Sequence, residues 1–230
     1  MNFKSHIPNT ITLLNLLSGV IGIIWVLNGN ILSGAYFIIL AAIFDFFDGF
    51  AARLLGVQGE LGKQLDSLAD LVTFGVLPGM ILFQMTKVEA EIEWLPYLTL
   101  IVPLLSAMRL AKFNLDTRQS DKFIGLPTPA NALFVSTLPY FFTEWPSVGA
   151  SLTSPFFLIG IAWVFAILLL VELPLIALKF KSYSLAGNKF RYALIAISLG
   201  LILAFGLAGI PIVILAYLGL SVVENSFSSE

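Results

Sequence analysis

Long apolar segments are the feature of this chain that most limits its fold. Of its 230 residues, 58% are hydrophobic and only 11% are charged, whereas about a quarter of the residues in soluble domains are charged. Eight apolar segments follow one another, at about 11–28, 31–55, 66–87, 95–115, 128–145, 155–180, 190–207 and 209–224. Segments of this length and composition can cross a bilayer as helices. We therefore expect an all-α integral membrane protein, a bundle of six to eight transmembrane helices.

The last two apolar segments leave the topology of the C-terminus open. They are short, only Gly206–Gly209 separates them, and Pro211 stands at the start of the second. They are therefore either two spans or one kinked helix. No repeat or linker divides the sequence, so we expect one membrane-embedded domain over 1–230, with a core at about 5–190 and a helical pair at about 190–224.

The basic residues lie almost entirely on one side of the expected spans. If the N-terminus lies in the cytoplasm, only Lys87 of the twelve basic residues falls on the other side of the membrane, in a loop rich in glutamate. The other eleven are Lys4, Arg53, Lys63, Arg109, Lys112, Arg118, Lys122, Lys179, Lys181, Lys189 and Arg191. Because membrane proteins keep lysine and arginine in their cytoplasmic loops, we expect a protein of the cytoplasmic membrane with its N-terminus in the cytoplasm.

Four aspartates interrupt the second and third apolar segments, at Asp45, Asp48, Asp66 and Asp70. A carboxylate at membrane depth is unfavourable, so such a cluster indicates a functional site. The spacings i, i+3 and i, i+4 place each pair on one face of a helix. The glycine-rich loop between the two pairs is short enough to return the chain antiparallel. The two acidic faces are therefore expected to oppose each other at the cytoplasmic end of these spans.

The residue types in this cluster favour hard divalent cations. Carboxylate oxygens without histidine or cysteine suit Mg²⁺ or Mn²⁺, with Ca²⁺ as an alternative, and the chain contains no cysteine. Four carboxylates packed together would repel one another unless cations neutralised them. Two cations are expected, as in many phosphoryl-transfer sites. Arg53, near the small residues Gly49 and Ala52, suits a phosphate group.

The acidic run resembles in full the signature of the CDP-alcohol phosphotransferase family. All eight fixed positions of that signature are present, as Asp45-x2-Asp48-Gly49-x2-Ala52-Arg53-x8-Gly62-x3-Asp66-x3-Asp70. The resemblance implies the fold of that family with a cytoplasm-facing active site, two divalent cations held by the four aspartates, and a homodimer. It implies that Asp70 is also the base that deprotonates the acceptor alcohol. It further implies that Asp48, Gly49, Ala52, Arg53 and Gly62 meet the CDP group, and that Gly62 also keeps the helices close.

Two other stretches resemble the phosphatidylserine synthase branch of this family. One is Ile7-Pro8-Asn9-x2-Thr12-x2-Asn15, and the other is Arg109-Leu110-Ala111-Lys112-Phe113-Asn114 followed by Gly125-Leu126-Pro127-x-Pro129-Ala130-Asn131. Asn9 and Thr12 lie three residues apart on one helical face and suit the cytidine or the pyrophosphate. A fixed cation suits the carboxylate of serine. We therefore predict that Arg109 binds it, with Lys112 and Asn114 as further candidates.

Together these patterns predict an enzyme of phospholipid biosynthesis. It would transfer the phosphatidyl group of CDP-diacylglycerol to L-serine, giving phosphatidylserine and CMP, with the bilayer but no nucleic acid as a partner. The same chemistry with glycerol phosphate or inositol phosphate is an alternative. A carboxylate-lined metal or proton transporter is an alternative from a different class of protein. A transporter, however, should distribute charge along a path through the bilayer. Glu172, within an apolar run, receives no role.

Overall fold

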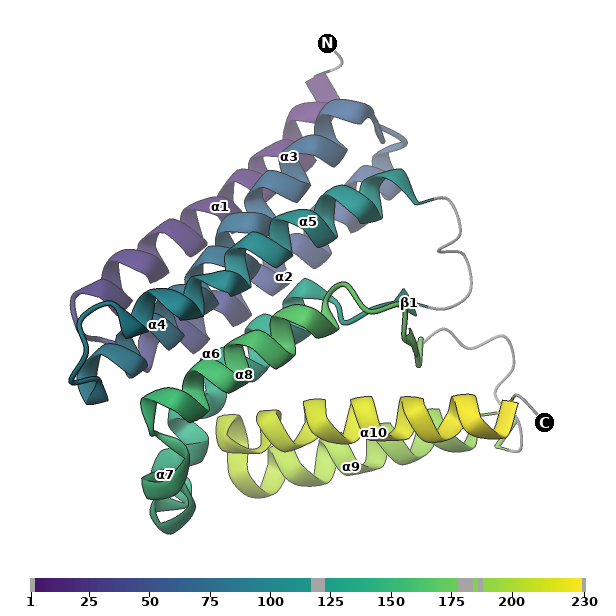
Figure 1. Ribbon diagram of the computed structural model, residues 1–230. Helices are drawn as coiled ribbons and strands as arrows, with labels where there is room; N and C mark the ends of the chain where they lie inside the picture. Colours follow the sequence, from purple (N-terminus) through teal and green to yellow (C-terminus); the bar gives the residue numbers. More distant parts are fainter. Residues whose placement is uncertain (1–2, 117–122, 178–183, 186–187, 229–230) are drawn as a thin grey trace.

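The computed structural model describes residues 3–116, 123–177, 184–185 and 188–228, and most of them are helical (Figure 1). The regular elements are α1 (His6–Leu27), α2 (Ser33–Leu55), α3 (Glu60–Asp70), a π-helical turn (Leu71–Val76), α4 (Leu77–Glu89), α5 (Ile101–Leu115), β1 (Phe123–Ile124), α6 (Thr128–Glu144), α7 (Pro146–Leu152), α8 (Pro155–Leu168), β2 (Pro174–Leu175), α9 (Lys189–Phe205) and α10 (Ile210–Ser228). Short 3₁₀ turns cover Phe3–Ser5, Leu95–Leu100 and Gly206–Gly209.

Several of these helices have the length and composition of membrane spans. Within the described part of the chain there are five such helical runs, His6–Leu27, Ser33–Leu55, Glu60–Glu89, Leu95–Leu115 and Lys189–Phe227. The pair formed by α7 and α8, bent by 82°, makes a sixth if it is counted as one span. The expectation of an all-α membrane protein is therefore confirmed.

The last run is a helical hairpin rather than one kinked helix. Gly206 ends α9 with a φ of +56°, a conformation that glycine adopts without steric penalty. The turn Gly206–Gly209 then reverses the chain, and α10 lies beside α9 (Figure 1). A Cβ atom on Gly209 would come within 2.6 Å of the carbonyl oxygen of Leu201. This close approach requires glycine at position 209.

Helices α1, α2 and α3 pack closely around the acidic residues. A Cβ atom on Gly19 of α1 would collide with Oγ1 of Thr73, so the absence of a side chain at position 19 allows α1 to approach the third span. Helix α2 ends at Gly56, whose φ is +63°. Residues 56–59 then return the chain into α3. The third span thus begins at residue 60, earlier than the predicted 66.

A π-helical turn follows directly after Asp70 in the third span. Wide turns of this kind are rare and often occur at functional sites. Thr73 in this turn donates a hydrogen bond to the carbonyl oxygen of Asn15 at 3.2 Å. On the other side, a Cβ atom on Gly75 would lie 3.0 Å from the Cβ atom of Ser106 in α5. The turn is therefore fixed between α1 and α5, and it fixes Asp70 with it.

The predicted span 155–180 is wrong over residues 169–177, and residues 178–180 lie outside the described part of the chain. Helix α8 ends at Leu168, and the chain continues through a turn to β2, which pairs antiparallel with β1. The amide of Gly125 donates a hydrogen bond to the carbonyl oxygen of Leu173 at 2.9 Å. Pro174 lacks an amide donor and disfavours a helical conformation in the residue before it. The apolar run therefore continues as strand and loop instead of helix.

The start of α1, β1 and the end of α10 lie at one end of the molecule (Figure 1). The predicted aspartate site is at this end, because α2 finishes there and α3 starts there. Lys87 lies near the far end of α4. Four basic residues used to predict the orientation, Arg118, Lys122, Lys179 and Lys181, lie outside the described residues.

Candidate active site

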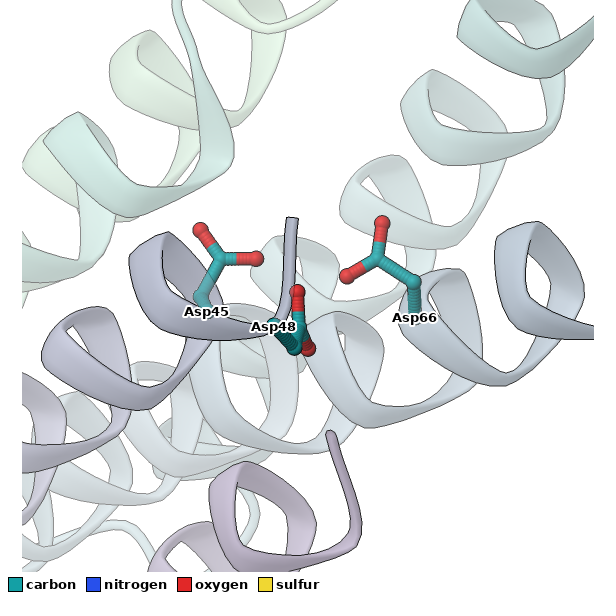
Figure 2. Close-up of side chains that lie close together, drawn as sticks. All are labelled: Asp45, Asp48 and Asp66. Atoms are coloured by element: carbon teal, nitrogen blue, oxygen red, sulfur yellow. The ribbon is translucent and has the colours of Figure 1, made fainter. Parts of the chain in front are cut away.

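Three carboxylates converge where α2 and α3 face each other. Asp45 and Asp48 come from α2 and Asp66 comes from α3, and each offers one oxygen within 4.8 Å of those of the other two. Figure 2 shows the carboxylates of Asp45 and Asp66 directed toward each other, with that of Asp48 between them in this view. We call these three residues the aspartate triad. Their convergence is the arrangement that the spacing of the sequence predicted for two opposed acidic faces.

The donor set of the aspartate triad fits a divalent cation. Thr12 donates a hydrogen bond to Oδ2 of Asp48 at 2.6 Å. Oδ1 of Asp66 is buried, and no donor among the described residues reaches it. A buried acceptor without a donor is unfavourable, and three carboxylates so close repel one another. A cation with oxygen ligands, such as Mg²⁺ or Mn²⁺, would relieve both conditions.

Asp70 is buried one helical turn beyond Asp66 and is not part of the aspartate triad. The side-chain amide of Asn15 in α1 donates a hydrogen bond to Oδ1 of Asp70 at 3.2 Å. Asp70 interacts electrostatically with Asp45, Asp66 and Asp48, and the guanidinium of Arg109 interacts in turn with Asp70. Asn15 is completely buried. No role was predicted for Asn15 from the sequence, although its spacing of three residues from Thr12 places both on one face of α1.

A cavity of about 440 Å³ opens beside the aspartate triad. It is lined by all seven residues that were predicted to bind CDP, Asn9, Thr12, Asp48, Gly49, Ala52, Arg53 and Gly62. Asp66 also lines it, so the cavity is continuous with the triad. We call it the first cavity. The structure thus brings the predicted nucleotide residues to one concave surface, formed by α1, α2 and α3.

Gly62 differs from its predicted role. It lies inside α3 rather than in the loop, and a Cβ atom there would be 3.6 Å from Oδ1 of Asn9, an ordinary contact. Helix packing therefore does not require glycine at this position. Its lack of a side chain instead leaves space in the first cavity.

Lys63 is a residue of the first cavity that the sequence analysis did not assign. Its ammonium group donates a hydrogen bond to the carbonyl oxygen of Asn114 at 2.7 Å. The side-chain amide of Asn114 donates to Oγ of Ser67 at 2.7 Å. Asn114, predicted to bind serine, thus links α5 to α3 and is not among the residues that line either cavity described here. Its role in serine binding stays a prediction.

A second cavity of about 370 Å³ lies where α5 ends and the chain leaves α8. Arg109 and Lys112, both predicted to bind serine, line it together with Glu172. The side chain of Arg109 is only 8% exposed, and its guanidinium lies 4.9 Å from the centre of the Phe113 ring. In the described part of the chain, no group accepts a hydrogen bond from this guanidinium. A buried guanidinium with unused donors beside a cavity suits an anionic ligand.

The family model described as CDP-alcohol phosphatidyltransferase matches residues 5–171. The chain belongs to this family. The match includes α1, α2 and the whole third span. It also includes all the residues that line the two cavities except Glu172. The family assignment therefore agrees with the signature of the sequence and with the convergence of the aspartate triad.

Several relatives carry more specific names. A Bacillus subtilis protein named CDP-diacylglycerol–serine O-phosphatidyltransferase is 38% identical over 129 residues, which cover 54% of this chain and 70% of that protein. A Methanocaldococcus jannaschii protein of the same name is 35% identical over 129 residues, covering 56% of this chain and 58% of that protein. The archaetidylserine synthase of Methanothermobacter thermautotrophicus is 32% identical over 146 residues, 60% of each chain. The chain thus spans less than two thirds of these two archaeal relatives.

Proposed function

We propose that this protein transfers the phosphatidyl group of CDP-diacylglycerol to the hydroxyl group of L-serine and releases CMP. The observation that carries the proposal is the buried guanidinium of Arg109, which lines the second cavity and donates no hydrogen bond to any group among the described residues. A carboxylate-bearing acceptor satisfies this guanidinium. The names of the relatives support serine as that acceptor. A transporter function is less compatible with the structure, because the acidic residues cluster at one end of the helices instead of along a path through the bilayer.

The aspartate triad is the proposed cation site, and Asp70 is predicted to be the fourth ligand. Two cations are predicted to bind there. Such cations, when bound, neutralise the pyrophosphate and stabilise CMP as it leaves. Thr12 orients the Asp48 carboxylate through its hydrogen bond of 2.6 Å. This bond fixes one oxygen of the triad before any ligand binds, which is the preorganisation that electrostatic catalysis requires.

The first cavity is the proposed site for the CDP group. Arg53 is exposed at its rim, and a Cβ atom on Gly49 would lie 3.4 Å from Nη1 of Arg53. The guanidinium thus lies over the Gly49 position of α2, at the cavity, where it can bind a phosphate oxygen. Asn9 and Thr12 face the same space from α1. Their polar groups suit the cytidine or the pyrophosphate.

Asp70 is the proposed general base. It accepts the proton of the serine hydroxyl while the serine oxygen forms a bond to the lipid-bearing phosphorus. The bond between this phosphorus and the oxygen of CMP breaks in the same displacement, and CMP leaves. Asn15 holds one oxygen of Asp70 by a hydrogen bond, which leaves the other oxygen for the serine proton. General base catalysis of this kind contributes about 10²–10⁴-fold to the rate.

The site is proposed to face the cytoplasm, with the protein in the cytoplasmic membrane. The predominance of basic residues at the aspartate end supports this orientation. The diacylglycerol tails would then remain in the leaflet while serine arrives from the water. A homodimer, implied by the family resemblance, is part of the proposal and can be checked by the mass of the purified protein in detergent.

The proposed function is tested by measuring CMP release from CDP-diacylglycerol by the purified protein with L-serine, glycerol phosphate or inositol phosphate. We expect serine-dependent release, and we expect Asp70→Asn to lower kcat by about 10²–10⁴-fold. Glu144→Gln, which alters a carboxylate at the last residue of α6, is the matched control and should leave the rate unchanged. CMP release with glycerol phosphate but not with serine would contradict the proposed acceptor.

A further inference from the structure

The segment that forms one wall of the second cavity continues directly into β2. Residues 169–172 line the cavity, and Ile124, which also lines it, pairs with Pro174 of β2. The two strands contain only two residues each. A two-stranded sheet this short is at best marginally stable in isolation, and its edges present backbone groups that need partners. Contacts from elsewhere in the chain must therefore fix this wall.

Helix α10 supplies partners for β2 and for the residue that follows it. The side-chain amide of Asn225 donates a hydrogen bond to the carbonyl oxygen of Pro174 at 2.6 Å. The backbone amide of Ile176 donates to Oγ of Ser221 at 3.1 Å. Ser221 and Asn225 lie four residues apart and so share one face of α10, and Ser221 is completely buried. This face of α10 therefore holds the backbone of residues 174–176.

Arg191 adds a contact from α9. Its Nε donates a hydrogen bond to the carbonyl oxygen of Ala177 at 2.9 Å, and its Nη1 lies 3.6 Å from Oε1 of Glu224 in α10. Ala177 is buried, so its carbonyl oxygen needs such a partner. The guanidinium of Arg191 thus joins both helices of the hairpin to the chain that leaves β2.

The hairpin formed by α9 and α10 lies beyond residue 171, where the family match ends. None of its described residues lines either cavity. We infer that this hairpin positions the wall of the second cavity, through the hydrogen bonds of Asn225, Ser221 and Arg191 to residues 174–177. The inference rests on the proposed function, in which the second cavity receives the acceptor alcohol. The three side chains are positioning residues, because they act on the acceptor only through the backbone of residues 169–177.

Loss of one of these bonds should loosen only one end of the cavity wall. At its other end, the segment 169–172 stays held, because the amide of Leu126 donates a hydrogen bond to the carbonyl oxygen of Leu168 at 3.0 Å. The first cavity is formed by α1, α2 and α3 and should not be affected. We therefore expect weaker binding of the acceptor with unchanged binding of the donor.

The test uses variants of Asn225 in the full-length protein. Asn225→Leu has a similar volume but no amide donor, whereas Asn225→Gln keeps the donor. Ser226→Ala is the control, because Ser226 is exposed on the same helix and its hydroxyl donates to the carbonyl oxygen of Val222 within α10. CMP release gives the KM values, and hydrogen exchange followed by mass spectrometry gives the protection of the backbone amides.

In Asn225→Leu we expect the KM for serine to rise about 3- to 10-fold, as for loss of one hydrogen bond between uncharged groups. Amide exchange should become faster over residues 169–177. The kcat and the KM for CDP-diacylglycerol should not change. Asn225→Gln and Ser226→Ala should stay close to the unmodified protein in both measurements.

An unchanged KM for the acceptor in Asn225→Leu would overturn the inference, whether or not exchange over residues 169–177 becomes faster. An equal rise of KM for donor and acceptor would also overturn it, because that result indicates a general loss of structure. The proposed function fails separately. If CMP release requires glycerol phosphate instead of serine, and Asn225→Leu raises the KM for glycerol phosphate alone, the proposed acceptor is wrong and the role of the hairpin stands.

Discussion

Asn15 provides a sharp test of how the fold positions Asp70. Its amide donates the hydrogen bond of 3.2 Å that holds Oδ1 of Asp70, and both residues are buried. A hydrogen bond to a charged group contributes about 1.5–3 kcal/mol, and each 1.36 kcal/mol changes a rate by about tenfold. If this energy serves to orient the base, Asn15→Ala should lower kcat by about 10- to 150-fold. The KM values for CDP-diacylglycerol and serine should change little, because Asn15 lines neither cavity.

Ser18→Ala is the matched control for this experiment. Ser18 is buried on the same helix, and its hydroxyl donates a hydrogen bond of 3.0 Å to the carbonyl oxygen of Phe37 instead of to Asp70. Both variants lose one buried hydrogen bond, so both should unfold in detergent at a slightly lower temperature. Only Asn15→Ala should lose turnover. Equal kcat values for the two variants would refute the argument that Asn15 positions the base.

Three further predictions concern the cation and the two cavities. A chelator should abolish CMP release, and added Mg²⁺ or Mn²⁺ should restore it. Asp66→Asn removes a carboxylate from the triad. It should therefore raise the metal concentration that gives the half-maximal rate by about tenfold or more. Arg109→Ala should raise the KM for serine by about 10-fold or more with little change for CDP-diacylglycerol, as measured by CMP release. Gly49→Ala should place a methyl group in the first cavity, which Gly49 lines, and raise the KM for CDP-diacylglycerol several-fold, whereas Gly160→Ala, in open space, should not.

The sequence was sufficient to predict the membrane helices and the convergence of the triad, because both depend on local rules. A span needs an unbroken apolar run, and spacings of three and four residues place side chains on one helical face. The end of α8 at Leu168 could not be predicted in this way. The segment after it finds its hydrogen-bond partners at Gly125 and Leu126, more than 40 residues earlier in the chain. Pairing over such a distance has no local signal.

The separation of Asp70 from the triad also depends on distant parts of the chain. The spacing of Asp66 and Asp70 indicates one shared face, and the family resemblance implies four metal ligands, with Asp70 also acting as the base. In the structure, Asn15 and the π-helical turn after Asp70 give this residue different surroundings. Its hydrogen bond with Asn15 of α1 joins two residues that are 55 positions apart in the sequence. Local periodicity therefore predicts the shared face, whereas the different environment of Asp70 comes from packing between helices. The role of Asp70 as a metal ligand stays a prediction.

The placement of the two cavities agrees with the stereochemistry of phosphoryl transfer. In such a displacement the attacking and leaving oxygens are roughly in line through the phosphorus, so donor and acceptor must reach it from different sides. The first cavity is formed by α1, α2 and α3, and the second by α5 and the segments next to β1 and β2. Asp48 and Asp66 line the first cavity, whereas Asp70 interacts with Arg109 of the second. Asp48 and Asp66 thus lie at the proposed donor side, and Asp70, which is proposed to take the proton of the acceptor, interacts with Arg109 at the proposed acceptor side.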